Sequence, residues 1–150
     1  PLKILLPQLD VTLLDSLNKR VDWLNEVSAQ LGLTDVRAIQ GRAEEKALDK
    51  SMRDSFDLVT ARAVADLRLL AELCLPYVKV GGYFLAMKAA AAQEELRQAE
   101  KGIGLLGGTV EALREYELEG ASRAIVVVRK TAPTPAKYPR AYAKIKQRPL

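Results

Sequence analysis

Short apolar runs alternate along the chain with longer segments in which apolar residues recur every three or four positions. The first pattern is typical of buried strands and the second of amphipathic helices. The first run, Val11–Leu14, is followed by a predicted helix over Leu17–Leu31, which Asp15 and Ser16 should cap and Gly32 should end. Leu2–Leu6 has the apolar composition of the end of a helix. The other predicted strands are Val36–Ile39, Phe56–Ala61, Tyr83–Met87, Val110–Leu118 and Ala124–Arg129, and the other predicted helices are 44–52, Leu67–Leu75 and Gln93–Leu106.

This alternation predicts an α/β domain built on a mostly parallel sheet. The last two strands are joined by only Glu119–Ala121, so we expect them to form an antiparallel hairpin at the end of the sheet. A chain of 150 residues is long enough for one folded domain. We place this domain at residues 1–130 and a basic C-terminal tail at residues 131–150.

Charge is distributed unevenly between the tail and the rest of the chain. Residues 129–150 contain seven basic side chains and no acidic one, whereas residues 1–128 contain 16 basic and 19 acidic side chains. Basic terminal segments of this kind commonly contact phosphate groups. A solvated, charged terminus is the alternative interpretation.

Several classes of chemistry are excluded by composition. The chain has no histidine and a single cysteine, Cys74, so it has neither a histidine general base nor a His/Cys zinc site. Cys74 lies between two leucines of a predicted helix and is interpreted as a core residue. No apolar run approaches the roughly 20 residues that cross a bilayer. We therefore expect a cytoplasmic protein with no metal site and no membrane segment, acting as a monomer.

Candidate binding residues follow the predicted strands, because ligands of parallel α/β sheets bind beyond the carboxyl ends of the strands. Asp15 follows the first strand and suits the hydroxyl groups of a ribose. Ala43 and Glu44 follow the second strand and suit an adenine. A helix cap and an ordinary turn are the alternatives for these two places.

Basic residues occupy the corresponding places further along. Arg62 follows the third strand between small residues, and Lys88 follows the fourth strand. They could orient a cofactor or pair with substrate phosphate. Lys19 and Arg20, after Asp15, could extend a positive rim. Surface salt bridges and solvated side chains are the alternatives for all four.

Four segments together resemble one family, the bacterial small-subunit ribosomal RNA guanine-N7 methyltransferases (RsmG, also called GidB). The resemblance extends over essentially the whole chain. The segments are VTLLDSLNKR at Val11–Arg20, GRAEE at Gly41–Glu45, DLVTARAV at Asp57–Val64 and KYPR at Lys137–Arg140.

The resemblance implies a Rossmann-like class I methyltransferase fold, with S-adenosylmethionine as the cofactor and the guanine at position 527 of 16S rRNA, in the small ribosomal subunit, as the target. It places Asp15, Ala43, Glu44 and Arg62 against the cofactor, and Lys88, Lys137 and Arg140 near RNA. No side chain is identified as catalytic, and alignment of the reactants by Arg62 and Lys88 would suffice.

One part of the family pattern is absent from this sequence. Family members have a strand and a glycine-rich loop, GxGxGxPG, before the segment that matches Leu2–Leu6. That strand is the middle one of the family's sheet. We therefore interpret the chain as N-terminally truncated, and we expect it to be inactive by itself.

Two other functions remain open from the sequence. One is a methyltransferase of the same fold that acts on a protein or a small molecule, although a small metabolite would not need the basic tail. The other is a non-catalytic RNA-binding or ribosome-binding module with a methyltransferase-like fold.

Overall fold

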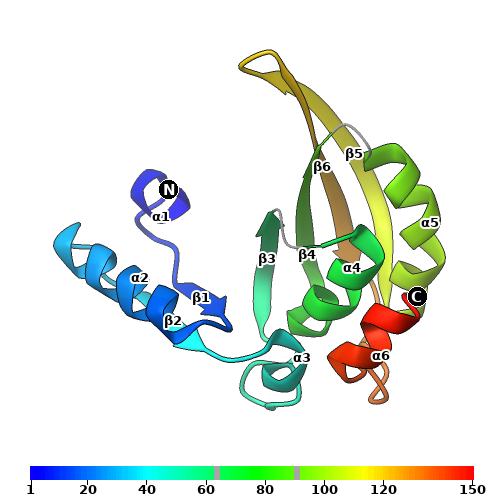
Figure 1. The fold of residues 1–150 in the computed structure, drawn as a ribbon, viewed down its shortest axis with the longest axis horizontal. Helices are drawn as coiled ribbons and strands as arrows, with labels where there is room; N and C mark the ends of the chain where they lie inside the picture. Colours follow the sequence, from blue (N-terminus) through cyan, green and yellow to red (C-terminus); the bar gives the residue numbers. More distant parts are fainter. Residues whose placement is uncertain (63–64, 90–91) are drawn as a thin grey trace. The chain divides into compact units, whose positions relative to one another are not determined.

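The computed structural model describes residues 1–62, 65–89 and 92–150. It consists of two compact units, Pro1–Glu45 and Lys46–Leu150, and each unit has a sheet of its own (Figure 1).

The first unit is built on two parallel strands. Strands β1 and β2 pair in register along their whole length, from Val11 opposite Val36 to Asp15 opposite Gln40. Helix α2 connects them, as expected for a parallel pair. The elements of this unit are α1 (Leu2–Leu5), β1 (Val11–Asp15), α2 (Asn18–Gln30), β2 (Val36–Gln40) and the start of α3 (Ala43–Lys46).

The start of α2 differs from the prediction. The helix begins at Asn18 after Leu17, which is extended and provides no side-chain cap. Asp15 lies too far back in the sequence to cap the first turn, and its Oδ1 instead accepts the backbone N–H of Leu17 at 2.8 Å. The predicted capping by Asp15 and Ser16 is therefore wrong. Aspartate side chains also accept the backbone N–H two residues on, which forms a local turn in place of a helix cap.

The second unit contains a four-stranded sheet in the order β3-β4-β6-β5. Strands β3 and β4 are parallel, and β6 is antiparallel to both β4 and β5. The predicted terminal hairpin is confirmed. Its turn is Glu119-Gly120, with φ of 52° and 72°, which is typical of a tight two-residue hairpin loop. The elements are β3 (Phe56–Arg62), α4 (Leu67–Cys74), the 3-10 helix η1 (Leu75–Tyr77), β4 (Val78–Ala89), α5 (Ala92–Leu105), β5 (Gly108–Leu118), β6 (Ala121–Lys130) and α6 (Tyr142–Gln147).

Two predicted boundaries change. The helix expected over 44–52 is only the single turn of α3, Ala43–Lys46. Strand β4 begins five residues earlier than expected, at Val78, and includes Gly81 and Gly82. A Cβ at Gly82 would lie 2.6 Å from the carbonyl oxygen of Asp57, so a glycine is needed where β4 passes β3.

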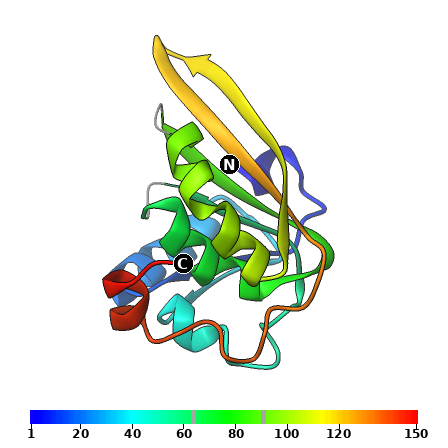
Figure 2. The same cartoon turned by 90° about the vertical axis from the view of Figure 1, so that its right-hand side faces the viewer.

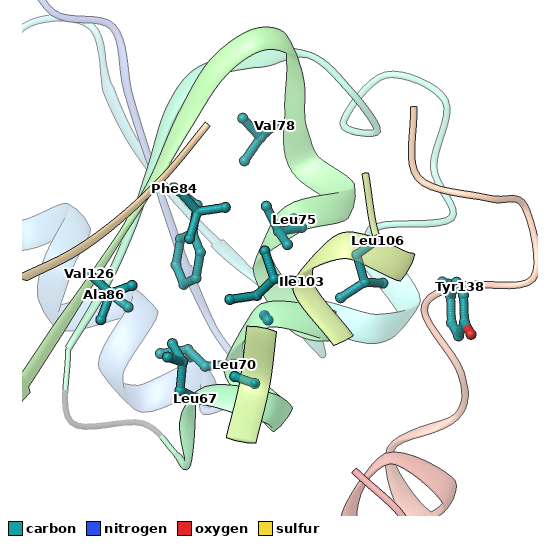
Figure 3. Packing of buried hydrophobic residues seen from close by; sticks show 13 residues of the cluster. Leu67, Leu70, Leu75, Val78, Phe84, Ala86, Ile103, Leu106, Val126 and Tyr138 are labelled. Atoms are coloured by element: carbon teal, nitrogen blue, oxygen red, sulfur yellow. The ribbon is translucent and has the colours of Figure 1, made fainter. Parts of the chain in front are cut away.

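The core of the second unit lies on one face of its sheet, under α4 and α5 (Figures 2 and 3). Phe84 and Ala86 of β4 pair with Val128 and Val126 of β6, so all four side chains point to the same face. Their neighbours in the core include Leu67 and Leu70 of α4 and Ile103 of α5, all at most 1% exposed.

Residues 131–150 are part of this second unit. Tyr138 belongs to the core cluster, Ile145 of α6 is fully buried, and Leu150 packs against the core. Lys130 is also fully buried, and its Nζ donates to the carbonyl oxygen of Leu75 at 2.6 Å and to Thr134. Residues of the segment 131–150 therefore pack against the core of this unit, and the division at residue 130 stays a prediction.

Within residues 1–62, 65–89 and 92–150, no helix is long and apolar enough to cross a membrane. The same residues contain no group of three or more His, Cys, Asp or Glu side chains placed to hold a metal ion.

Cys74 should be unreactive in the folded protein. It packs against the core, and burial raises the pKa of its thiol from 9.0 to about 12. Because the thiolate is the reactive form, a disulfide reagent should label Cys74 slowly at about pH 8 and rapidly once guanidinium unfolds the chain. Unfolding also frees the thiol to ionise, so stability should fall as the pH rises above 9. Fast labelling of the native protein would contradict this assignment.

Candidate functional site

The two strands of the first unit end level with each other. Asp15 is opposite Gln40, and the N–H of Gly41 donates to the carbonyl oxygen of Asp15 at 3.0 Å. Gln40 Nε2 donates in turn to the carbonyl oxygen of Ser16 at 3.0 Å. The structure thus brings Asp15 next to the segment that follows β2, as the sequence predicts.

Asp15 is an ionised acceptor that remains partly exposed, at 24% of its side chain. The backbone N–H of Leu17 lowers the pKa of this carboxyl, and Arg20, whose Nη1 lies 3.3 Å from Oδ2, lowers it further. A carboxylate offers about four lone-pair positions. With Leu17, Arg20 and the backbone of Ser16 as donors, the partly exposed carboxylate keeps acceptor capacity for the hydroxyl groups of a ligand.

The carboxylate of Glu44 forms an ion pair with Arg42, two residues earlier in the chain. Its side chain is 8% exposed, and Oε1 accepts Arg42 Nε at 2.5 Å. Ala43 is the first residue of α3 and is half-buried. At this place the structure offers a small side chain beside a buried, paired carboxylate, which suits a flat apolar ligand face better than a charged one.

Arg62 and Lys88 lie at the same end of the sheet of the second unit. Arg62 ends β3 opposite Met87 of β4, and Lys88 is the next residue along. Arg62 is exposed and makes no ion pair with any residue that the structure describes.

Lys88, in contrast, is half-buried and forms an ion pair. Its Nζ lies 2.7 Å from Glu95 Oε2 and donates to the carbonyl oxygen of Ala65 at 2.8 Å, and its side chain is 12% exposed. Glu95 also accepts the N–H of Leu67. Lys88 therefore ties β4 to the start of α4 and α5. Ala63, Val64, Ala90 and Ala91, which the sequence places around these residues, lie outside the described part of the chain.

The remaining candidates differ in availability. Lys19 is exposed on α2. Arg20 is 67% exposed and pairs with Asp15. Lys137 is exposed, with Nζ 5.3 Å from the ring centre of Tyr138. Of these three, Lys19 and Lys137 are free of any ion pair among the described residues.

Arg140 is held by a buried carboxylate. Its Nε and Nη2 donate to Glu72 Oε1 at 2.9 Å and Oε2 at 2.6 Å, and its backbone N–H also donates to Oε1. Glu72 is fully buried in α4, whereas the side chain of Arg140 is 22% exposed. These hydrogen bonds raise the pKa of the Arg140 guanidinium. Arg140 thus anchors the C-terminal segment to α4.

A hollow of about 250 Å³ lies within the first unit. Its lining includes Lys3 of α1 and Thr34, which precedes β2, so it is at the amino end of the strands of the first unit. Parallel sheets bind ligands at the opposite end, and the hollow is therefore no candidate for the cofactor site.

The fold belongs to one class, the Rossmann-like fold of the class I S-adenosylmethionine-dependent methyltransferases. The structure is similar to the 16S rRNA (adenine(1408)-N(1))-methyltransferase W203A mutant with cosubstrate SAM from Catenulisporales acidiphilia. The TM-score is 0.70 at 13% identity, over 87% of this chain and 77% of that one. It is also similar to TrmN from Thermus thermophilus, with a TM-score of 0.59 at 19% identity over 80% and 36%.

The sequence identifies the family. The chain belongs to the rRNA small subunit methyltransferase G (GidB) family, whose model matches residues 1–126. It is 54% identical to ribosomal RNA small subunit methyltransferase G of Geobacillus thermodenitrificans over 93% of the chain and 60% of that relative. It is 50% identical to the protein of the same name from Streptococcus sanguinis over 100% and 64%. The chain thus spans about three fifths of the length of these relatives.

Sequence reasoning did not find the partners of the basic residues. Glu72 and Glu95 are ordinary helix residues in the sequence, and nothing in their spacing indicates that they bind Arg140 and Lys88. Arg53 was also missed: its guanidinium donates to the carbonyl oxygens of Thr134 and Tyr138. For Glu72, the one available signal in the sequence is its position on the apolar face of the amphipathic helix α4.

Removal of Arg140 should destabilise the protein strongly. Arg140→Ala leaves the buried Glu72 carboxylate without its partner, so we expect the free energy of unfolding to fall by about 2–4 kcal/mol. Glu72→Gln, added to Arg140→Ala, should restore part of this loss because it removes the unpaired charge. Arg129→Ala, an exposed control, should change stability by less than about 0.5 kcal/mol. Guanidinium unfolding measures all four proteins, and an Arg140→Ala variant as stable as the parent would show that the pair is not an anchor.

Proposed function

We propose that the protein transfers a methyl group from S-adenosylmethionine to N7 of a guanine, at position 527, in the 16S rRNA of the small ribosomal subunit. The observation that supports this most strongly is the family match over residues 1–126, which includes both sets of strand ends described above. The substrate and the cytoplasmic location that ribosomal RNA implies are part of the proposal, as is action by a monomer.

The residues present fit such a cofactor. Asp15 is ionised and retains acceptor capacity for ribose hydroxyls. Ala43, beside the paired Glu44, provides a small, weakly polar surface for an adenine. Arg62 is exposed at the end of β3 and would orient the cofactor or the RNA. Asp15 lies in the first unit and Arg62 in the second, and their convergence on one ligand stays a prediction.

The proposed reaction needs no general base. The cofactor supplies a methyl group activated on sulfur, and guanine N7 has a lone pair in the ring plane, without a proton to remove. The lack of histidine in the chain is therefore no obstacle. The contribution of the protein would be proximity and orientation of the two reactants, with Arg62 offsetting negative charge on the RNA.

The basic candidates are proposed to act in two ways. Lys19 and Lys137, exposed and free of ion pairs among the described residues, would contact RNA phosphates directly, and Arg20 would help orient Asp15. Lys88 and Arg140, paired with Glu95 and Glu72, would act as positioning residues. N7 lies in the deep major groove of A-form RNA, so the target base would have to be in a loop or unstacked.

Activity is proposed to need more of the sheet than this chain supplies. Among the described strands, β1 pairs only with β2 and β3 pairs only with β4. Each therefore has one edge of unpaired backbone groups, which native sheets normally cover or pair. By itself, the chain would act as an RNA-binding module without turnover.

A chimeric protein tests the activity. We expect no methylation by this chain alone, and cofactor-dependent N7 methylation by a fusion of the chain with the part of the Geobacillus thermodenitrificans relative that it does not cover. The assay maps 7-methylguanine in 16S rRNA of unmethylated small subunits by mass spectrometry, with the whole relative as the positive control. Methylation of another atom or another RNA by the fusion would reject the proposed specificity, and turnover by the chain alone would reject the incomplete sheet as the cause of inactivity.

Asp15 should govern cofactor affinity in the same fusion. Asp15→Asn keeps an oxygen for the N–H of Leu17 but removes the charge that would bind ribose hydroxyls, so we expect S-adenosylmethionine to bind about 10- to 100-fold more weakly. Asp10→Asn, at an exposed position before β1, is the matched control and should leave affinity unchanged. Isothermal titration calorimetry gives both constants. Equal affinities would remove Asp15 from the proposed cofactor site.

A further inference from the structure

The β5–β6 hairpin extends past the end of its neighbouring strand. Ala89, the last residue of β4, is opposite Arg123 of β6, and the hairpin goes on to pair Glu117 with Ser122 and Leu118 with Ala121. Figure 1 shows this extension beyond the ends of β3 and β4. That is the carboxyl end of the parallel strands, where Arg62 lies.

The extension has two chemically different faces. Residues opposite each other in an antiparallel pair share a face, and successive residues alternate. Arg114, Tyr116 and Leu118 of β5 therefore share one face with Arg123, which is opposite Tyr116. The acidic residues of the same stretch, Glu115 and Glu117, are on the other face.

The basic face of the hairpin is continuous with Arg62. One row across the sheet runs from Arg62 through Met87 and Ile125 to Arg114. The next row toward the carboxyl end contains Ala89, Arg123 and Tyr116. Neighbouring strands are about 4.8 Å apart, so the backbones of Arg62 and Arg114 are about 14 Å apart. The apolar residues Met87 and Ile125 lie between them.

These side chains are available to a partner. All three arginines are exposed, and Tyr116 is 42% exposed. Among the residues that the structure describes, Arg123 donates only to the carbonyl oxygen of its neighbour Ser122. Within the described residues, none of the three arginines forms an ion pair.

We propose that Arg62, Arg114, Tyr116 and Arg123, here called the arginine face, bind single-stranded RNA next to the base that is methylated. This inference rests on the proposed function and adds to it a contact surface on the β5–β6 hairpin. Arginines bind phosphates bidentately, and an exposed tyrosine stacks on an unpaired base. The glutamates on the opposite face repel phosphate, so the charge pattern selects the side of the hairpin on which the RNA lies.

The partner fits RNA better than an acidic peptide. The ring of Tyr116, flanked by cations, matches a ligand that carries flat bases and phosphates together. The position at the carboxyl end of β3 and β4 is also where a substrate base has to arrive if the cofactor binds beyond these strand ends.

Matched substitutions on the two faces test the arginine face. The paired variants are Arg114→Gln with Arg123→Gln on the basic face, and Glu115→Gln with Glu117→Gln on the acidic face. Tyr116→Ala removes stacking, and Tyr116→Phe retains it. Binding of a fluorescent 16S rRNA loop fragment is measured by anisotropy at several salt concentrations, with this chain and with the fusion protein. Circular dichroism and melting temperature check that each variant is folded.

We expect the double arginine variant to lose about 10-fold or more in affinity and to show a smaller salt dependence, since about two phosphate contacts disappear. Tyr116→Ala should bind about 5- to 100-fold more weakly, whereas Tyr116→Phe and the glutamine variants of the two glutamates should bind at least as well as the parent. Cofactor affinity of the fusion should not change in any of them.

The outcomes separate this inference from the proposed function. If the fusion methylates 16S rRNA and the folded arginine and tyrosine variants bind RNA like the parent, the arginine face is overturned and the enzyme assignment stands. If the fusion binds no cofactor and methylates no RNA while the variants still weaken RNA binding, the proposed function fails and the surface stands. Equal weakening by the glutamate variants would also overturn the arginine face, because the effect would then not depend on which face is changed.

Discussion

Parallel pairing of strands is the constraint on which the candidate site depends. It sets β1 level with β2 and β3 level with β4, so residues far apart in the sequence arrive together at the carboxyl ends of the strands. Asp15 meets Gly41 in this way, and Arg62 meets Met87 and Lys88. The site is a property of strand register, which the hydrophobic face of each sheet maintains.

Interactions of buried charged side chains hold the C-terminal segment against the rest of the second unit. Seven basic residues in 129–150 indicate a phosphate-binding tail when only their number is considered. Two of them have other roles: Lys130 is fully buried between Leu75, Thr134 and Asp54, and Arg140 is held by the buried Glu72. A buried charge is tolerated only with partners that satisfy its hydrogen bonds, so each of these residues fixes several others. The basic charge that stays exposed on this segment is therefore smaller than the composition suggests.

The β5–β6 hairpin shows how one strand pattern can serve two purposes. Near α5, alternate residues of β5 and β6 fill the core, and beyond the end of β4 the same alternation separates arginines and a tyrosine from glutamates. The tight Glu119-Gly120 turn keeps both strands in register as far as the tip.

The sequence by itself determined the order of strands and helices, the α/β class, the terminal hairpin and the family, because hydrophobic periodicity and short motifs are local signals. It also indicated that Cys74 is a core residue and that Asp15 lies next to the segment after β2. Only the tertiary structure decided which charges are free. Lys88 and Arg140 look like Arg62 and Lys137 in the sequence, yet Lys88 is bound to Glu95 of α5 and Arg140 to Glu72 of α4, whereas Arg62 and Lys137 are exposed. Likewise, the hairpin arginines form a surface with Arg62 only because β6 lies between β4 and β5. Such pairings depend on which elements become neighbours in space, and no local pattern of residues specifies that.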